Sequence, residues 1–237
     1  YAYAGSFYAF AIWIGLGVMA IIDLLNRVVK NDKVRTVAAV VTVLVTLLVP
    51  AQMASQNWDD HDRSNRYSAR DFGANYLKSC DKEAIIFCNG DNDTFPLWYN
   101  IEVEEERNDV RACNLSYLQT DWYIDQMKRP YYNSPGLPIS WEYKDYMPGK
   151  NEIAWVENRL HAPLEVSKAF QFLLSADPRT KRDGEGYIPS DQLYVLSPDS
   201  QKIMFKKARR FTRSEMMVME MLSTNEWKRP MYFAVTI

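Results

Sequence analysis

The sequence is poor in the residues that most often carry catalysis or bind metal ions. Its 237 residues include three cysteines and two histidines, and no C-x-x-C pair or other Cys/His ligand spacing occurs. This argues against a disulfide framework and against a structural zinc site. A Ser/His/Asp nucleophile elbow, a G-x-G-x-x-G motif and a P-loop are missing as well. The sequence therefore carries no signature of those hydrolase or nucleotide-binding classes.

The chain also lacks an excess of charge of either sign. Its 28 Lys+Arg residues stand against 30 Asp+Glu residues, which leaves a net charge of −2. No global electrostatic field attracts nucleic acid or another charged polymer, so we expect local binding, with no nucleic-acid partner. We also expect no cofactor and no required metal. Cys80, Cys88 and Cys113 cannot all pair and are interpreted as small apolar core residues; Cys88 and Cys113 can be neighbours, with two buried thiols favoured over a disulfide.

Two long apolar runs stand at the start of the chain, over residues 7–25 and 34–54. Each is close to the ~20 residues that a helix needs to cross the hydrocarbon of a bilayer. Neither run has a polar face, which disfavours a helical hairpin buried in a soluble protein. We therefore predict two transmembrane helices.

The loop between these runs gives an orientation. Its cations Arg27, Lys30, Lys33 and Arg35 lie close together, while the outer flanks of the two runs carry almost none. By the positive-inside rule this loop is cytoplasmic, and residues 55–237 lie on the other side of the membrane. A secretory signal peptide fits poorly because a cationic segment ahead of the first apolar run is missing.

The part after the apolar runs reads as an α/β lobe. Apolar spacing predicts a helix over 69–77, and strand 84–88 is apolar throughout, as a central parallel strand would be. A helix over 96–107, a strand over 110–116 and a helix over 120–128 follow. This alternation predicts a small, partly parallel sheet with a right-handed crossover.

The second half of the lobe is predicted with less regularity. Residues 130–149, rich in Tyr, Pro and Gly, are expected to form an irregular loop on the surface. We expect a helix over 163–176 and extended segments over 192–196 and 202–205. The sequence TRSE at 212–215 is a capping box that opens a Met-rich helix over 213–223.

The first candidate site is the stretch NGDNDTFPLWY at 89–99, directly behind the expected central strand. Loops at the carboxyl ends of parallel strands line the crevice in which α/β sheets bind ligands. Carboxylates and amides there can grip a sugar or a hard cation, and an indole can stack on a sugar ring. The candidate residues are Asn89, Asp91, Asn92, Asp93 and Trp98.

A purely structural interpretation of this stretch stays open and is somewhat favoured. Gly90 supplies a turn, Asp91 and Asn92 close Asx-turns, and Asp93 or Thr94 caps the following helix. The spacing of its acidic residues resembles the start of a calcium loop, but the required glycine and distal glutamate are not in place.

The second candidate site is WDDHDR at 58–63, which emerges from the second apolar run and is expected at the lipid headgroups. Three carboxylates around one histidine can bind a divalent ion or act as a base, and an arginine can meet a lipid phosphate. A solvated, charged linker is an equally good interpretation. The candidate residues are Asp59, Asp60, His61, Asp62 and Arg63.

Four longer motifs carry a family resemblance: WDDHDRSNRYSARDF, IIFCNGDNDTFPLWY, NLSYLQTDWYIDQMKRP and TNEWKRPMYFAVT. Together they resemble a bacterial multi-pass membrane family of unknown-function domain proteins, which is similar to the animal transmembrane protein O-mannosyltransferases. The resemblance implies a C-type glycosyltransferase architecture, in which membrane helices bind a polyprenyl-phosphate sugar and an extracytoplasmic lobe receives the acceptor protein. In such enzymes the catalytic carboxylate lies in an early outer loop, so no catalytic residue is assigned here.

The resulting expectation is a piece of a longer polypeptide, because the sequence opens without Met and closes within an expected strand. Residues 1–54 would be the last two spans of a helical bundle, and residues 55–237 a lobe that is incomplete at its C-terminus. The expected function is transfer of a sugar, mannose by the resemblance, to Ser/Thr of exported proteins. The expected location is the bacterial inner membrane with residues 55–237 periplasmic. The alternative is a non-catalytic, membrane-anchored module for binding or assembly in the envelope.

Overall fold

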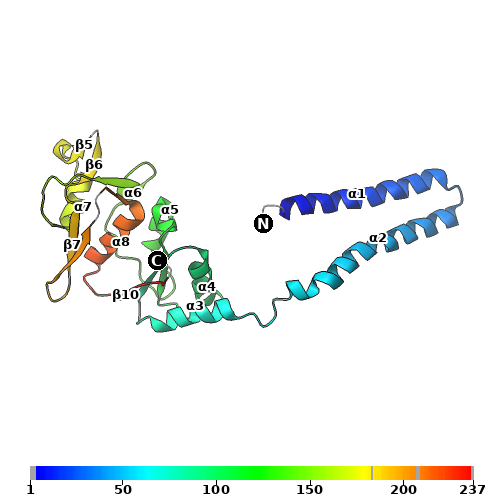
Figure 1. The fold of residues 1–237 in the computed structure, drawn as a ribbon, viewed down its shortest axis with the longest axis horizontal. Helices are drawn as coiled ribbons and strands as arrows, with labels where there is room; N and C mark the ends of the chain where they lie inside the picture. The colour runs from blue at the N-terminus through cyan, green and yellow to red at the C-terminus, as the bar shows by residue number, and fades with distance from the viewer. Residues whose placement is uncertain (1–3, 183, 207–208, 236–237) are drawn as a thin grey trace. The chain divides into compact units, whose positions relative to one another are not determined.

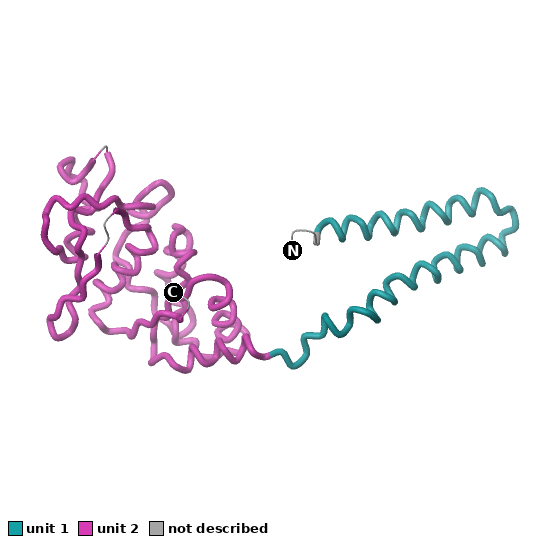
Figure 2. Tube along the Cα trace, viewed as in Figure 1, with its two compact units in different colours: residues 1–66 teal, residues 67–237 magenta. Residues whose placement is uncertain are grey.

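The computed structural model describes residues 4–182, 184–206 and 209–235. It divides the chain into two compact units, Tyr1–Arg66 and Tyr67–Ile237 (Figure 2). The first unit consists of two apolar helices, and the second is a mixed α/β region with parallel and antiparallel sheets (Figure 1). The predicted fold class is confirmed.

The first unit is a hairpin of the helices α1 (Ala4–Val28) and α2 (Asp32–His61). Asn31 begins α2, since its side chain accepts hydrogen bonds from the backbone of Lys33 at 3.0 Å and Val34 at 3.3 Å. Both helices are long and apolar enough to cross a membrane, and the apolar windows of neither are buried within the protein. Such fully exposed apolar surface is unfavourable in water and suits a lipid environment.

Hydroxyl groups inside the second apolar helix are satisfied by its own backbone. Thr42 Oγ1 donates to the carbonyl of Ala38 at 2.8 Å, and Thr46 Oγ1 donates to Thr42 at 3.0 Å. The helix also continues beyond residue 54, the expected end of the membrane segment, for another seven residues to His61. Residues 58–61 of the charged stretch WDDHDR thus form the last helical turn.

The second unit contains a three-stranded parallel sheet in the order β10-β1-β2. Its strands are β1 (Ile85–Cys88), β2 (Arg111–Asn114) and β10 (Met231–Phe233). All four residues of β1 are buried. Ile86 and Cys88 pack in one apolar cluster together with α3 (Ser68–Ser79) and α4 (Asp91–Glu102). Ile85 and Phe87 pack in the other, together with α5 (Asp121–Met127) and α8 (Arg213–Thr224). The parallel central strand is confirmed.

Two further sheets complete the second unit (Figure 1). The order β5-β6-β3-β9 joins β5 (Lys181–Arg182), β6 (Glu185–Ile188), β3 (Ile153–Val156) and β9 (Arg210–Thr212). The order β4-β7-β8 joins β4 (Leu164–Glu165), β7 (Gln192–Leu196) and β8 (Lys202–Lys206). The remaining helices are α6 (Tyr143–Tyr146), α7 (Val166–Leu174) and the short η1 (Tyr117–Gln119) and η2 (Pro178–Thr180).

The capping box at the start of α8 is confirmed. The backbone of Thr212 donates to Glu215 Oε2 at 2.8 Å, and the backbone of Glu215 donates to Thr212 Oγ1 at 3.4 Å. The cysteines are confirmed as buried free thiols. Burial raises the pKa of Cys88 to about 11, so this thiol stays protonated and is a poor nucleophile at neutral pH.

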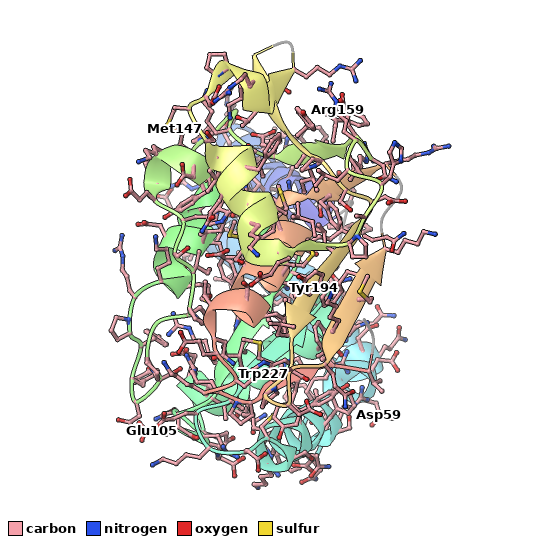
Figure 3. The ribbon with its side chains drawn as sticks, turned by 90° about the vertical axis from the view of Figure 1, so that its left-hand side faces the viewer. Asp59, Glu105, Met147, Arg159, Tyr194 and Trp227 are labelled. Atoms are coloured by element: carbon pink, nitrogen blue, oxygen red, sulfur yellow. The ribbon has the colours of Figure 1, made fainter. Side chains whose placement is uncertain are left out.

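Helix α4 begins and ends earlier than the predicted 96–107. It starts at Asp91, directly behind Gly90, and Pro96 lies inside it. It ends at Glu102, and the chain then turns through Glu105 (Figure 3) and Arg107, whose φ angles are 54° and 53°. The reason is a contact that is distant in sequence: the Arg107 guanidinium donates to backbone carbonyls at the end of α3 and to the Asp109 carboxylate.

The prediction that residues 130–149 are irregular holds for most of the segment, but the predicted surface position is wrong. The segment contains the one-turn helix α6 with its own capping box between Glu142 and Asp145. It also buries Leu137, Trp141 and Tyr146, which are 4%, 2% and 1% exposed. Leu137, Ile139 and Trp141 alternate as in a strand, but the prolines and the glycine in PGLPISW favour a loop, so the pattern did not predict a place in the core.

We predict that the pair of Arg107 and Asp109 stabilises the lobe. The hydrogen bond from Arg107 lowers the pKa of Asp109 from 3.8 to about 2, so its carboxylate contributes stability above pH 4 that is lost as the pH falls toward 2. Asp109→Asn should lower the free energy of unfolding by about 1–2 kcal/mol at pH 7, and the difference from wild type should shrink below pH 4. Thermal unfolding of the full chain in detergent measures this.

The matched control is Glu226→Gln, which breaks the exposed ion pair between Glu226 and Lys228. Exposed pairs contribute little, so this variant should unfold like wild type at every pH. Equal unfolding temperatures of Asp109→Asn and wild type at pH 7 would contradict a stabilising role of Asp109.

Candidate functional site

The predicted crevice lies where β1 and β2 end. Gly90, with a φ angle of 80°, turns the chain from β1 into α4. Asn89 is exposed, and its Oδ1 accepts a hydrogen bond from Ser116 Oγ at 2.9 Å. This contact ties the residues that follow the two strands to each other, so the structure brings Asn89 to the carboxyl edge of the sheet.

The floor of this crevice is a hydrogen-bond network around the fully buried Thr94. Thr94 Oγ1 donates to the carbonyl of Gly90 and accepts from Asn114 Nδ2, each at 2.7 Å. Asn114 Oδ1 accepts from the backbone of Tyr117 at 3.0 Å. Asp93 is buried beside this network, with 1% of its surface exposed.

Protein partners hold the Thr94 hydroxyl, and Gly90 supplies the turn, as the structural interpretation expects. The capping that it predicts is wrong, because Gly90 is the N-cap of α4 and Asp93 and Thr94 lie inside the helix. Asp91 and Asn92 lie in the first helical turn and not in Asx-turns.

The other crevice candidates lie at the start of α4. Asp91 and Asn92 are exposed in its first turn, and within the described part of the chain their side chains make no hydrogen bond. Helices α3 and α4 lie close together at Gly73. A Cβ atom added at this position would lie 2.4 Å from the carbonyl oxygen of Pro96. Trp98 is half-buried and faces a different hollow, described below.

The second group of candidates lies at the end of α2, in the first unit, and all of its residues are exposed. His61 Nδ1 lies 2.9 Å from the carbonyl of Asn57, and Arg63 Nη1 donates to the carbonyl of Asp60 at 2.6 Å. Asp62 accepts a hydrogen bond from the backbone of Ser64 at 2.8 Å. The carboxylates of Asp59 and Asp60 make no hydrogen bond to other described residues. No group of three or more His, Cys, Asp or Glu residues within the described ranges is arranged to hold a metal ion.

Trp98 contributes to a hollow of about 320 Å³ beside β2, the edge strand of the parallel sheet, which we call the aromatic pocket. Its wall is formed by α4, β2, α5 and the segment after α5. Trp98 stacks on Tyr117 with ring centroids 6.0 Å apart and an angle of 13° between the planes. The residues that line the pocket also include Glu102, Asn108, Arg111, Trp122, Tyr131 and Tyr132.

Arg111 is the buried charge of the aromatic pocket, and only 5% of it is exposed. Its Nη2 donates to the carbonyls of Gln126 and Arg129, each at 3.2 Å, and its Nε lies 3.5 Å from Met127 Sδ. Its Nη1 is buried and makes no hydrogen bond. Burial lowers the pKa of Arg111 from its ordinary value, which is the expected effect of desolvating a cation.

Glu102 organises the mouth of the aromatic pocket. Its Oε2 accepts hydrogen bonds from the hydroxyls of Tyr131 at 2.9 Å and Tyr132 at 3.0 Å. The hydrogen bond to Glu102 raises the pKa of Tyr131. The Tyr131 ring also covers the guanidinium, with 5.4 Å between Arg111 Cζ and the ring centroid. Aromatic rings with a few placed polar groups are a typical lining of ligand pockets.

Of the residues predicted from sequence, only Trp98 belongs to the aromatic pocket. Sequence reasoning missed Glu102, Arg111, Trp122, Tyr131 and Tyr132. The available signals were an arginine near the start of the expected strand 110–116 and the density of aromatic residues in TDWY and RPYY. Neither signal predicts that these residues lie close together in the fold.

Comparisons with known proteins give a family match and one distant relative. Residues 69–206 match the family model described as TMEM260-associated domain 2. A relative described as Protein O-mannosyl-transferase tmem260, from Dictyostelium discoideum, is 22% identical over an alignment of 154 residues that covers 58% of this chain. The chain spans 19% of that relative's length. No solved structure matches.

We predict that Thr94 is structural, whereas Asn92 is not. Thr94→Val removes the hydrogen bonds of the hydroxyl with Gly90 and Asn114 and its contact with Cys88 Sγ. It leaves Asn114 Nδ2 without its partner, so it should lower the free energy of unfolding by about 1–3 kcal/mol. Asn92→Ala is the matched control, two residues away in α4. Its free energy of unfolding should stay within about 0.5 kcal/mol of wild type. Thermal unfolding of both variants in detergent measures the difference, and equal stabilities would contradict the network.

Proposed function

This chain belongs to the TMEM260-associated domain 2 family, and from that membership we propose that it is part of a membrane glycosyltransferase. In this proposal the whole protein moves a sugar from a polyprenyl-phosphate donor to Ser or Thr of exported proteins. This chain supplies two membrane spans and the lobe that meets the acceptor. The catalytic base belongs to another part of the protein, as in C-type glycosyltransferases.

The observation that carries the proposal is the position of the family match together with the relative's activity. The match covers most of the second unit, and the relative is described as a protein O-mannosyl-transferase. We propose mannose as the sugar on the strength of that description alone. The hairpin of two possible spans supports a membrane protein, which is where a lipid-linked donor would be met.

The candidate residues receive roles within this proposal. Trp98 would stack on a sugar ring or an acceptor side chain at the aromatic pocket, while Asn89, Asp91, Asn92 and Asp93 would border the acceptor. At the end of α2, the exposed carboxylates, His61 and Arg63 would lie near the headgroup of the donor lipid. We propose the bacterial inner membrane as the location, with the lobe in the periplasm.

The decisive experiment deletes the full-length gene and compares the glycan masses on exported proteins. We expect the deletion to remove a hexose from Ser/Thr sites and the wild-type gene to restore it. Complementation with Trp98→Ala should restore about 2–10-fold less product, because one aromatic contact is lost. Asp60→Ala and Asp91→Ala test the other proposed contacts, and Glu226→Gln is the exposed control that should restore wild-type levels.

Unchanged glycosylation in the deletion strain, with no redundant paralogue, would remove the transferase proposal. A non-catalytic binding or assembly module in the envelope would then be the better function.

The orientation is tested separately by labelling with a membrane-impermeant maleimide. The three native cysteines are buried and should label weakly in the folded chain. Gln201→Cys, in the exposed turn between β7 and β8, should label in intact spheroplasts, whereas Asn26→Cys at the end of α1 should label only after lysis. The reverse pattern would place the lobe in the cytoplasm and contradict access to exported proteins.

A further inference from the structure

Arg111 and Arg213 are the most buried arginines of the described lobe, at 5% and 3% exposed. Arg213 has the Glu152 carboxylate 3.7 Å from its Nη2. Within the described residues, Arg111 forms no ion pair and donates only to two neutral carbonyls and a thioether. Buried charges are normally paired, because desolvation is costly. An anion brought to this guanidinium would offset that cost.

The unpartnered atom of Arg111 belongs to a concave, aromatic site. Its Nη1 makes no hydrogen bond, and the side chain lines the aromatic pocket. Asn108 lines the same pocket, and its buried Oδ1 also has no hydrogen-bond partner. The wall of the pocket therefore contains a charged donor and an acceptor without hydrogen-bond partners, and neighbouring groups cover both atoms. Native proteins leave few such groups unsatisfied, so a bound group that fills both is a natural explanation.

We propose that the aromatic pocket binds a glycan unit that carries a carboxylate, of the hexuronic acid class. The carboxylate would pair with Nη1 of Arg111, and a ring hydroxyl would donate to Asn108 Oδ1. The apolar face of the sugar ring would stack on Trp122, which is 54% exposed. This ligand class builds on the proposed acceptor-side role of the lobe, where it would recognise an acidic glycan on the acceptor.

The charge of the pocket favours a carboxylate over a phosphate. Among the described residues, Arg111 and Glu102 are the charged side chains that line it. One guanidinium nitrogen with free hydrogens suits a single negative charge, whereas a phosphate dianion would meet the Glu102 carboxylate without a second cation to balance it. The partly exposed rings around it suit a ring-shaped ligand with an apolar face.

Tyr131 controls access to Arg111. Its ring covers the guanidinium, but the residue is 44% exposed and its hydroxyl donates to Glu102 at the mouth of the pocket. When the ligand enters, the Tyr131 ring turns aside, and the carboxylate takes its place against Nη1. Tyr132, bonded to the same oxygen of Glu102, remains at the rim.

The test measures sugar binding to the full chain in detergent micelles by calorimetry. The probes are methyl β-D-glucuronide and, as its neutral match, methyl β-D-glucoside, with inorganic phosphate as a third arm. We expect the glucuronide to bind at least about tenfold more tightly than the glucoside, and Arg111→Gln to remove that preference. Trp122→Ala should weaken binding about 2–10-fold. Trp155→Ala, which is 52% exposed and lies outside the aromatic pocket, is the matched control and should bind like wild type.

A second variant keeps the proposal testable if Arg111→Gln does not fold. Glu102→Gln keeps an acceptor for both tyrosines but removes the repelling charge, so it should bind glucuronide about threefold more tightly and glucoside unchanged. Equal affinities of wild type for the two sugars, no glucuronide binding at ~10 mM, or tighter binding of phosphate would each overturn the proposal. If glucuronide binds but the gene deletion leaves glycosylation unchanged, only the proposed transferase function fails.

Discussion

The second unit depends on arginine side chains that donate hydrogen bonds to buried backbone carbonyl groups. These carbonyls lack the partners that helices and sheets supply elsewhere. Much of this lobe is irregular chain between short strands, and every buried carbonyl in it needs a donor. Arg213 Nη1 donates to Gln119 at 2.8 Å and its Nη2 to Lys150 at 2.7 Å, so one side chain fixes two loops to the start of α8. Arg229 does the same for Glu83 and for Gly136, at 2.8 and 3.2 Å. A guanidinium suits this task because its donors are several and rigidly arranged.

The same device explains the shape of the aromatic pocket. Arg111 holds the end of α5 through the carbonyls of Gln126 and Arg129, as the other arginines hold their loops. It lies on the edge strand β2, however, and no carboxylate of the described residues forms an ion pair with it. The Tyr131 ring covers its guanidinium instead. A structural anchor with an unused donor thereby lines a largely aromatic hollow, in which Glu102 is the other charged side chain among the described residues.

Local patterns in the sequence predicted the elements that depend on local physics. The two apolar helices, the parallel strand β1, helix α3 and the capping box of α8 all follow from hydrophobic periodicity or from contacts within four residues. The core role of residues 130–149 and the early end of α4 could not be predicted in this way. They rest on pairings such as Arg229 with Gly136, 93 residues apart, and Arg107 with Leu77, 30 residues apart. The aromatic pocket was missed for the same reason, since its wall combines four separate segments.

Protein groups fill the crevice that was expected at the carboxyl ends of the strands, which explains why the pocket lies elsewhere. In open α/β sheets, ligands usually enter at the carboxyl ends of the strands. Here Thr94 and Asn114 bind each other across that edge, and Asn89 binds Ser116 just beyond it. A ligand would have to break these bonds between satisfied partners to enter, which costs as much as it gains. Beside β2 the proposed ligand would give Arg111 and Asn108 hydrogen-bond partners, and Arg111 would give up its contact with the Tyr131 ring. On this proposal hydrogen bonding favours a ligand at the edge of the sheet, whereas the sequence pattern points to the carboxyl ends of its strands.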